Sequence, residues 1–447
     1  MVTTIASAQG QLADGNANAL SLLTSCVERV CNPAGEGARV FPHGVSMAAR
    51  KQAQASDMLR EQGVAGPLSG IPVSVKDLFD VQGDVTRAGS RVLPEVPASE
   101  DAPAIARLRA AGAVFVGRTN MTEFAYSGVG INPHYGTPRN PYDRQAGRIP
   151  GGSSSGAAVS VTDGMALAAI GSDTGGSCRI PAALCGIVGF KPTASRVPLD
   201  GLVPLSSSYD SVGCMANTVA CCAAVDAVMA GDASPITPTL LAGLRLAVPM
   251  GLVLDGMSEE VAEVFSRTLR RLSKAGAVLR DVTFNSWNQL GDLGTNGGLV
   301  AAEASAWHAD LISAQADRYD PRVLSRIGLA QEQRATDYVR MSRRREALRR
   351  HADAELADFD AVVLPTVPIV APRIAELDND DTFFNTNRLL LRNPAVANML
   401  DLCALSLPCH QLGDAPIGLM LFGRNLADRR LLAIGMAVEA ALRHERG

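Results

Sequence analysis

A serine at the end of a glycine-rich turn is the first residue of this chain that could do chemistry. Ser177 lies in SDTGGSCR, directly after Gly175 and Gly176. Consecutive glycines allow positive φ and can turn successive backbone N–H groups toward one point, where they hold an oxyanion. A serine at the end of such a turn can attack a carbonyl held there. The alternative is a structural glycine turn with a capping serine, and this motif alone leaves both interpretations open.

A second glycine-serine cluster, GGSSSG, lies upstream. Its three serines, Ser153, Ser154 and Ser155, precede an Ala-rich segment, where serines are ordinary helix N-caps. The cluster also matches Gly-x-Ser-x-Gly, with Ser154 at the nucleophile position, but that motif requires a preceding buried strand. The residues before it, AGRIP, form a polar loop. We therefore favour a capping role over a nucleophile elbow.

A lysine stands at the end of an apolar segment, which is unusual unless an amine is needed there. Lys76 follows an expected strand at 71–75 in GIPVSVKD. The ordinary lysine pKa is about 10.4, so only about one amine in 2,500 is neutral at pH 7, and service as a base requires a downward pKa shift of roughly three units. Burial and nearby N–H dipoles can supply that shift. The alternative is an ion pair with Asp77 or Asp80.

The remaining motifs give no sign of a metal or a cofactor. The six histidines form no HExxH pair, and Cys409-His410 lacks the spacing of a zinc site. No GxxxxGK[ST] phosphate loop occurs. A Ser-His-Asp triad stays open, because its members can be far apart in sequence, but no local pattern favours it.

Composition narrows the class of partner. The net charge is −4 and aromatic residues make up 4% of the chain, which argues against a nucleic-acid surface. Nine cysteines without framework spacing, and an N-terminus without a signal-peptide pattern, favour a cytoplasmic location. The most membrane-like segment, 212–231, contains Asn217 and Asp226, so we expect a buried helix and no membrane span. The Arg-rich segment 336–357 mixes acids with bases, which is typical of a solvated helix face.

Strands that alternate with helices predict an α/β fold whose sheet is covered on both faces. We expect helices at 3–32, 45–63, 102–111, 156–169, 258–274 and 336–357. We expect strands at 71–75, 113–116, 244–248, 277–282, 361–364 and 417–422, and glycine-rich or polar loops at 133–150 and 171–178. No repeat or disordered linker divides the chain, so we expect one large domain over 1–447.

Lys76, GGSSSG and SDTGGSCRIPAALCGIVGFKPT together resemble the amidase signature family. The interval between Ser153 and Ser177 agrees with that family (177 − 153 = 24). Similar blocks extend over nearly the whole chain: GPLSGIPVSVKD, GRTNMTEFAYS, NPHYGTPRNPYD, GLVPLSSSYDSVG and APIGLMLFG. The resemblance implies the amidase signature fold, a single large domain with a mixed central sheet between helices and a catalytic core at about 70–215.

The resemblance also implies roles in a Ser-cisSer-Lys mechanism. Ser177 would be the nucleophile, Ser153, on a cis peptide, the proton shuttle, and Lys76 the neutral base. The supporting groups it implies are backbone N–H groups of Thr174, Gly175, Gly176 and Ser177 as an oxyanion hole, Ser154 to orient Lys76, and Asp173 with Arg179 to brace the loop. The sequence departs from the family pattern at Ser155, where a glycine is usual, and at Ala194 and Ser195, where Tyr-Gly is common.

The substrate is less well defined by the sequence. Met121, Phe124 and Tyr126 are candidate substrate-binding residues, with contributions from 286–330 and 383–400, although Phe124 and Tyr126 could equally be core. We expect an amidohydrolase that cleaves a linear amide, an aryl amide or a carbamate. The alternatives are a glutaminase-type subunit of a tRNA-dependent amidotransferase and a non-catalytic binding protein on the same scaffold. The expected partner is a small molecule, and a homodimer is a family-level expectation.

Overall fold

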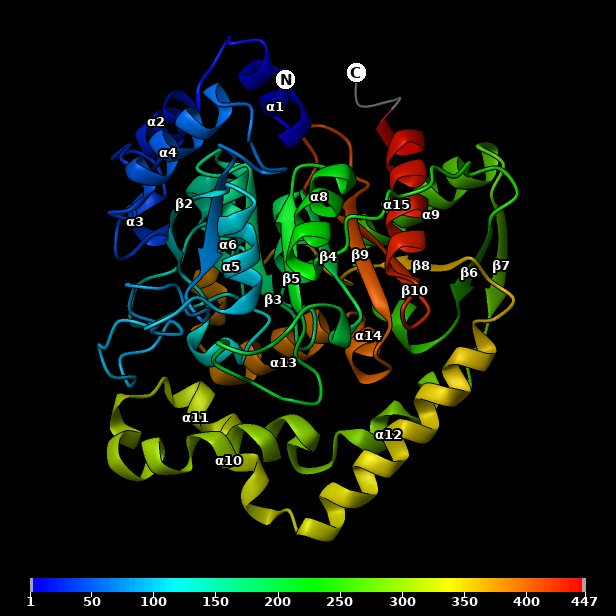
Figure 1. Cartoon of the computed structure of the whole chain (residues 1–447). Coiled ribbons are helices and arrows are strands. Elements are labelled where there is room, and N and C mark those ends of the chain that lie inside the picture. The colour runs from blue at the N-terminus through cyan, green and yellow to red at the C-terminus, as the bar shows by residue number, and fades with distance from the viewer. Residues whose placement is uncertain (1–2, 444–447) are drawn as a thin grey trace.

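A ten-stranded sheet runs through the middle of the computed structural model, which describes residues 3–443 (Figure 1). Its strand order is β2-β1-β3-β5-β4-β9-β10-β8-β6-β7. The strands are β1 Pro72–Lys76, β2 Val114–Thr119, β3 Ala168–Ser172, β4 Val188–Lys191, β5 Val212–Ala216, β6 Arg245–Pro249, β7 Val278–Val282, β8 Ala361–Pro365, β9 Cys403–Pro408 and β10 Gly418–Gly423. Pairs at the two ends of the sheet are parallel, and the central pairs from β3 to β8 are antiparallel. The predicted mixed α/β sheet is therefore confirmed.

Helices cover both faces of this sheet (Figure 1). The helices are α1 Ile5–Ala13, α2 Ala19–Val30, α3 Gly37–Val40, α4 Ala49–Glu61, α5 Pro103–Ala110, α6 Ser155–Thr162, α7 Arg179–Cys185, α8 Val219–Ala230, α9 Glu259–Lys274, α10 Gly298–Gln315, α11 Pro321–Gly328, α12 Ala335–Glu355, α13 Asp380–Arg392, α14 Ala395–Met399 and α15 Asp428–Arg443. One core cluster joins α5, α8, α9 and α15 to the sheet, and a second joins α2, α4, α6 and α7. Because alternate side chains of a strand point to opposite faces, apolar strands such as β1 are buried on both sides.

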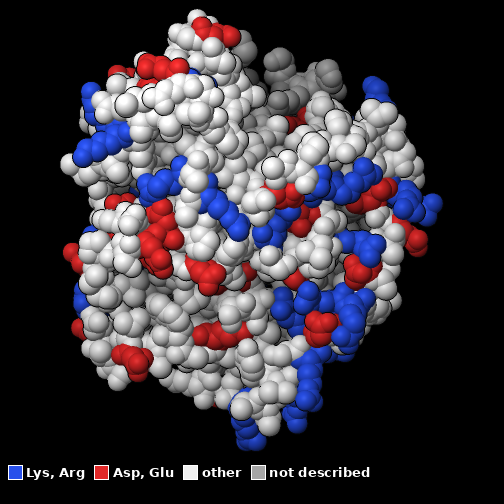
Figure 2. Space-filling model, in the orientation of Figure 1, with Lys and Arg blue, Asp and Glu red and all other residues white. Residues whose placement is uncertain are grey.

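A group of helices extends beyond one end of the sheet. Figure 1 shows α10, α11 and α12 below the strands, next to α13 and α14. At the lower right of Figure 2, where α12 lies in Figure 1, Lys and Arg side chains predominate, with some acidic side chains among them. Arg344 pairs with Asp292 and Arg350 with Glu346, which agrees with the solvated face predicted for this helix. None of the helices in residues 3–443 has the length and apolarity needed to cross a membrane.

Two predicted helices are wrong in part. The expected helix at 156–169 ends at Thr162, and residues 168–169 belong to β3, because Gly164 adopts φ +67° and ends the helical path. The expected helix at 212–231 is strand β5 followed by α8. Thr218 separates them, since its side chain accepts a hydrogen bond from Cys221 N–H and begins α8 there.

Further differences concern boundaries and missed strands. The segment expected as one helix at 3–32 is two helices, α1 and α2, because Asn18 caps a new helix by accepting from Ser21 N–H. Strands β4 and β9 were not predicted, although both are central and fully buried. Short apolar runs of this kind are consistent with either a strand or a buried helix.

Candidate active site

The candidate catalytic residues lie at the ends of two adjacent parallel strands. β1 ends at Lys76 and β3 ends at Ser172, and Val75 pairs with Ile170 between them. The loop that carries Ser177 follows β3 directly, while Ser153 precedes α6. A backbone hydrogen bond from Ser154 N–H to Ser177 O, at 3.3 Å, holds the two glycine-serine segments together. The fold therefore brings together all three residues of the predicted mechanism.

Lys76 is completely buried, and its amine contacts two hydroxyl groups. Nζ donates to Ser153 Oγ at 2.7 Å and to Ser172 Oγ at 2.8 Å. The alternative of an ion pair at the strand end is wrong. Asp77 pairs with Arg118 at 3.4 Å, and Asp80 accepts from the Thr86 hydroxyl. Lys76 is thus held by neutral partners, as a base would need to be.

Burial shifts Lys76 toward its neutral form. Burial lowers its pKa to about 8, although the nearby acidic groups Cys178, Asp173 and Asp210 act in the opposite direction. At pH 7 a lysine with this pKa is neutral in about one molecule in ten, compared with about one in 2,500 for an ordinary lysine. The fraction of neutral amine is therefore roughly 200 times larger than in solution.

The serines of GGSSSG have three different environments. The peptide bond between Gly152 and Ser153 is cis. Ser154 stands at the N-cap position of α6, but its hydroxyl donates to Ser172 O at 3.4 Å and makes no cap bond. Ser155 also points inward and donates to Asn120 O at 3.5 Å. The side chain in place of the usual glycine is thus accommodated in the interior.

Ser172 has the contact that was expected of Ser154. Its hydroxyl lies 2.8 Å from Lys76 Nζ, whereas Ser154 reaches only the Ser172 carbonyl. The expectation that Ser154 orients Lys76 directly therefore needs correction. No sequence signal predicted this contact, because residues 168–172 were expected to form the end of a helix and the start of a loop. The contact follows from the pairing of β3 with β1, which places Ser172, the last residue of β3, beside the strand that ends at Lys76.

Asp173 and Arg179 form a fully buried ion pair behind the Ser177 loop. Two guanidinium nitrogens of Arg179 approach the carboxylate at 2.8 and 3.0 Å. Asn398 donates to Asp173 Oδ1 at 3.0 Å and accepts from Arg179 at 2.8 Å. Burial opposes ionisation of Asp173, but the charge and hydrogen bonds of Arg179 prevail and lower its pKa to about 2. The predicted bracing arrangement is present in these contacts.

The backbone N–H groups of the loop divide into two sets. Gly176 N–H donates to Asp173 Oδ1 at 2.8 Å, and Cys178 N–H donates to Oδ2 at 3.1 Å. Within residues 3–443, no acceptor is bound by the N–H groups of Thr174, Gly175 or Ser177. The inclusion of Gly176 in the oxyanion hole is therefore corrected, because its N–H is already turned to the Asp173 carboxylate.

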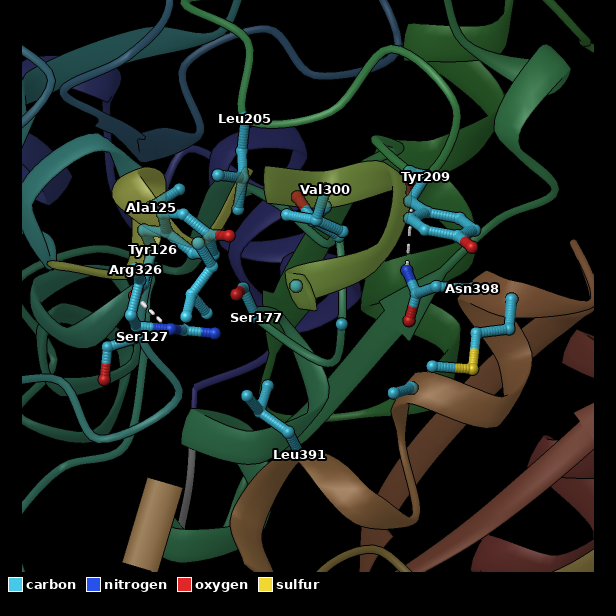
Figure 3. A pocket seen from close by; sticks show the side chains of 16 residues that line it. Ala125, Tyr126, Ser127, Ser177, Leu205, Tyr209, Val300, Arg326, Leu391 and Asn398 are labelled. Carbon is cyan, nitrogen blue, oxygen red and sulfur yellow. Dashed lines mark hydrogen bonds between the residues drawn. The ribbon is translucent and has the colours of Figure 1, made fainter. Parts of the chain in front are cut away.

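Ser177 opens onto a cavity of about 220 Å³ (Figure 3). Its hydroxyl and the Ser153 hydroxyl are not hydrogen-bonded to each other in the described chain. The lining residues are Ala125, Tyr126, Ser127, Thr174, Gly175, Ser177, Leu205, Tyr209, Gly297, Val300, Arg326, Leu329, Leu391, Ala395, Asn398 and Met399. The predicted contributions from 286–330 and 383–400 are present in this wall.

Two of the three predicted substrate-binding residues do not reach the cavity. Tyr126 lines it, but Met121 and Phe124 belong to the hydrophobic core. The Phe124 ring packs edge-on against His308, with centroids 4.4 Å apart, and lies 5.4 Å from the Tyr319 ring. Sequence reasoning could not separate the two aromatic residues, because both occur in one short apolar segment.

Comparison with known proteins finds similarity to amidases. The protein-family model described as Amidase matches residues 40–432. The chain is 38% identical over 405 residues to the 2-amino-5-chloromuconic acid deaminase of Comamonas testosteroni, covering 88% of this chain and 86% of that protein. It is 34% identical over 475 aligned positions to one subunit of the glutamyl-tRNA(Gln) amidotransferase of Chloroflexus aurantiacus, covering 98% and 96%. A solved structure described as an amidase superposes with a TM-score of 0.89 at 33% identity, covering 98% of this chain and all of the other.

Proposed function

This chain belongs to the amidase family, and from that premise we propose that it is an amidohydrolase that cleaves a C–N bond through an acyl-enzyme on Ser177. The observation that carries the proposal is the amine of Lys76, buried and held 2.7 Å from Ser153 Oγ beside the Ser177 loop. A buried lysine with a lowered pKa, whose hydrogen-bond partners within residues 3–443 are serine hydroxyls, is suited to remove a proton rather than to form an ion pair.

In the proposed mechanism, neutral Lys76 takes the proton of Ser153 while Ser153 takes the proton of Ser177. Ser177 Oγ then bonds to the carbonyl carbon, and the free N–H groups of Thr174, Gly175 and Ser177 stabilise the oxyanion. The C–N bond breaks as the proton returns to the leaving amine. Water then attacks the acyl-enzyme along the same proton path and releases the acid.

The test is to replace the nucleophile and to label it. Ser177→Ala should lower kcat/KM for any amide that the protein cleaves by about five orders of magnitude. It should also abolish labelling by a fluorophosphonate, which reacts with activated serines. Ser160→Ala is the matched control, because Ser160 is a buried serine of α6 that bonds Ser74 and Ala157 O. Equal activity or labelling in Ser177→Ala would exclude Ser177 as the nucleophile.

A second candidate function is the glutaminase-type subunit of a tRNA-dependent amidotransferase. It is favoured by the 34% identity to such a protein over almost the whole of both chains. The two candidates differ in what they need. A stand-alone amidohydrolase turns over as the purified chain, whereas a glutaminase subunit hydrolyses glutamine only when its partner subunits are added. Glutamine hydrolysis should therefore be measured with and without those partners.

The proposed activity includes hydrolysis of carbamates, because a carbamate presents the same carbonyl to Ser177. A cytoplasmic location and a homodimer remain predictions that need their own measurements, fractionation of cells and sedimentation of the purified protein. A hydrolysis panel of an aliphatic amide, an aryl anilide and an aryl carbamate, each with the Ser177→Ala control, would fix the bond that is cleaved.

A further inference from the structure

The cavity in front of Ser177 contains one charged side chain. Of the sixteen described residues that line it, only Arg326 is charged, and most of the others are apolar, including Leu205, Val300 and Leu391. Figure 3 shows the Arg326 guanidinium extending into the cavity on the side of Ser177. A cation in an apolar cavity has lost hydration and needs a replacement partner.

Protein groups provide hydrogen-bond acceptors for only part of the Arg326 guanidinium. Arg326 lies over the Tyr126 ring, 4.1 Å from its centroid, and one nitrogen donates to Tyr126 O. Within residues 3–443 no carboxylate lies within ion-pair distance of it. The guanidinium has five N–H donors in a planar fork, so most of them remain available to a ligand.

Two other arginines of this chain, Arg179 and Arg345, have more acceptors among protein groups. Arg179 has the carboxylate of Asp173. Arg345 also lies over a tyrosine ring, that of Tyr209, but it donates to Met399 O at 2.9 Å and to Asn398 O at 3.1 Å. The contrast with Arg345 shows that stacking on tyrosine does not by itself leave an arginine without acceptors.

Arg326 also stands where two cavities meet. A second, mainly apolar cavity of about 660 Å³ shares Arg326, Leu391, Ala395 and Met399 with the first. Its other walls include Phe284 and Trp287. A group bound by Arg326 would therefore lie at the boundary of the Ser177 cavity, with the space of the second cavity beyond it.

We propose that Arg326 binds a carboxylate of the substrate, so that this enzyme acts on amides that carry a carboxylate. The inference rests on the proposed function, since it assigns the substrate class of the Ser177 site. The planar fork of a guanidinium matches the two oxygens of a carboxylate, and the apolar surroundings strengthen the ion pair. The alternative is that Arg326 has only a structural role, in which it holds α11 against Tyr126.

The test compares anionic amides with neutral amides of matched shape. Succinamate and glutaramate carry a carboxylate on the acyl side, and N-acetylglycine and N-acetyl-β-alanine carry it on the amine side. Butyramide, valeramide, N-ethylacetamide and N-propylacetamide are the neutral counterparts, with a methyl group in place of the carboxylate. We expect the wild type to prefer at least one anionic amide over its counterpart by about 100-fold in kcat/KM.

Variants of Arg326 separate recognition from folding. Arg326→Gln should lower kcat/KM for the preferred anionic amide by about 100-fold and change that for its neutral counterpart by less than about threefold. Arg326→Lys should recover about a tenth of the lost activity, because it keeps the charge without the fork. Arg322→Gln is the matched control: Arg322 is on the same helix and lies over the Phe383 ring, but it does not line the cavity. A purely structural role would lower both substrate classes equally.

A second measurement does not depend on turnover. Succinate and glutarate should slow fluorophosphonate labelling of Ser177 in the wild type and in Arg322→Gln, but not in Arg326→Gln, while butyramide should protect none of them. Labelling of Ser177 without protection by any dicarboxylate and without a preference for anionic amides would overturn the proposal and leave the proposed function intact. Absence of labelling and of hydrolysis would instead overturn the proposed function.

Discussion

The two sides of the cavity are built in opposite ways. On one side are residues 173–178, which we call the nucleophile loop after the role proposed for Ser177. Buried polar groups bind one another there: Asp173 alone accepts from Arg179, Asn398 and two backbone N–H groups. On the other side is the apolar wall, which we define as the lining residues outside the loop, with Asn398 excepted because it is bonded to Asp173 and Arg179. It is mainly aliphatic and contains the incompletely satisfied Arg326.

We infer from this difference that the loop serves the reaction and that the wall selects the substrate. A loop that is held by a buried ion pair keeps its free N–H groups in place, which is what stabilisation of an oxyanion requires. An apolar wall has no comparable network, so its residues can change with less effect on the nucleophile. We therefore expect changes in the loop to abolish turnover or stability, and changes in the wall to alter substrate preference.

The largest effect after loss of Ser177 should come from Lys76→Met. Removal of the base should lower kcat/KM by about 1,000-fold. In the wild type kcat/KM should rise about tenfold per pH unit below the Lys76 pKa of about 8 and become constant above it, because only the neutral amine accepts a proton. Lys191→Met is the control, since Lys191 is also buried but donates to Pro192 O and Leu402 O. The pH profile of kcat/KM for Lys191→Met should retain the inflection near pH 8. Loss of that inflection in this control would argue against Lys76 as the group that titrates.

Asp173→Asn should destabilise the protein through the nucleophile loop. It leaves the buried Arg179 without its carboxylate, so we expect the free energy of unfolding to fall by about 3 to 5 kcal/mol in urea titrations. Asp353→Asn is the contrast, because the pair of Asp353 with Arg424 is largely exposed on both sides. That variant should cost about 0 to 1 kcal/mol. Equal losses would show that burial of the loop pair contributes nothing extra.

The same pair has a defined dependence on pH. The folded-state pKa of Asp173 is about 2, below the ordinary value of 3.8, so its contribution to stability is fully present above pH 4 and is lost as the pH falls toward 2. As the pH falls through this interval, Asp173→Asn should therefore lose less free energy of unfolding than the wild type, because it lacks this carboxylate. Urea midpoints at several acidic pH values would measure the difference.

Phe124→Leu should affect stability but not substrate preference. Phe124 packs in the core against His308 and Tyr319 rather than lining the cavity. The smaller side chain should cost about 1 to 2 kcal/mol of unfolding free energy. The ratio of kcat/KM between succinamate and butyramide should stay as in the wild type. A changed ratio would show that Phe124 influences substrate preference although it does not line the cavity.

The contrast between loop and wall also explains how much of the site could be predicted. The loop is encoded locally: Asp173, Ser177 and Arg179 occur in one short motif, and the structure brings them together in the same loop. Errors there concern the direction of single groups, such as Gly176 N–H, which depends on the position of the Asp173 carboxylate.

The wall is assembled from segments that are distant in the sequence. Tyr126, Arg326 and Leu391 meet only after the helical group beyond the sheet has packed onto the loop. Nothing in the local sequence around Arg326 distinguishes it from Arg322, which forms an ion pair with Asp380 on the same helix. For the same reason the α/β class was predicted, while the central strands β4 and β9 were missed and residues of β3 and β5 were expected in helices.

The smallest expected effect is that of Tyr209→Phe, which tests whether the wall is truly without polar specificity. The Tyr209 hydroxyl is buried and, within the described residues, has no hydrogen-bond partner, and burial raises the pKa of this phenol to about 12. Because no protein hydrogen bond is lost, we expect the free energy of unfolding to change by less than about 1 kcal/mol. Tyr338→Phe is the matched contrast and should cost more, about 1.5 to 3 kcal/mol, since its hydroxyl donates to Glu303 at 2.9 Å. If Tyr209→Phe instead lowered kcat/KM for succinamate tenfold at unchanged stability, the hydroxyl would be bound to the substrate, and selection at this site would not rest on Arg326 alone.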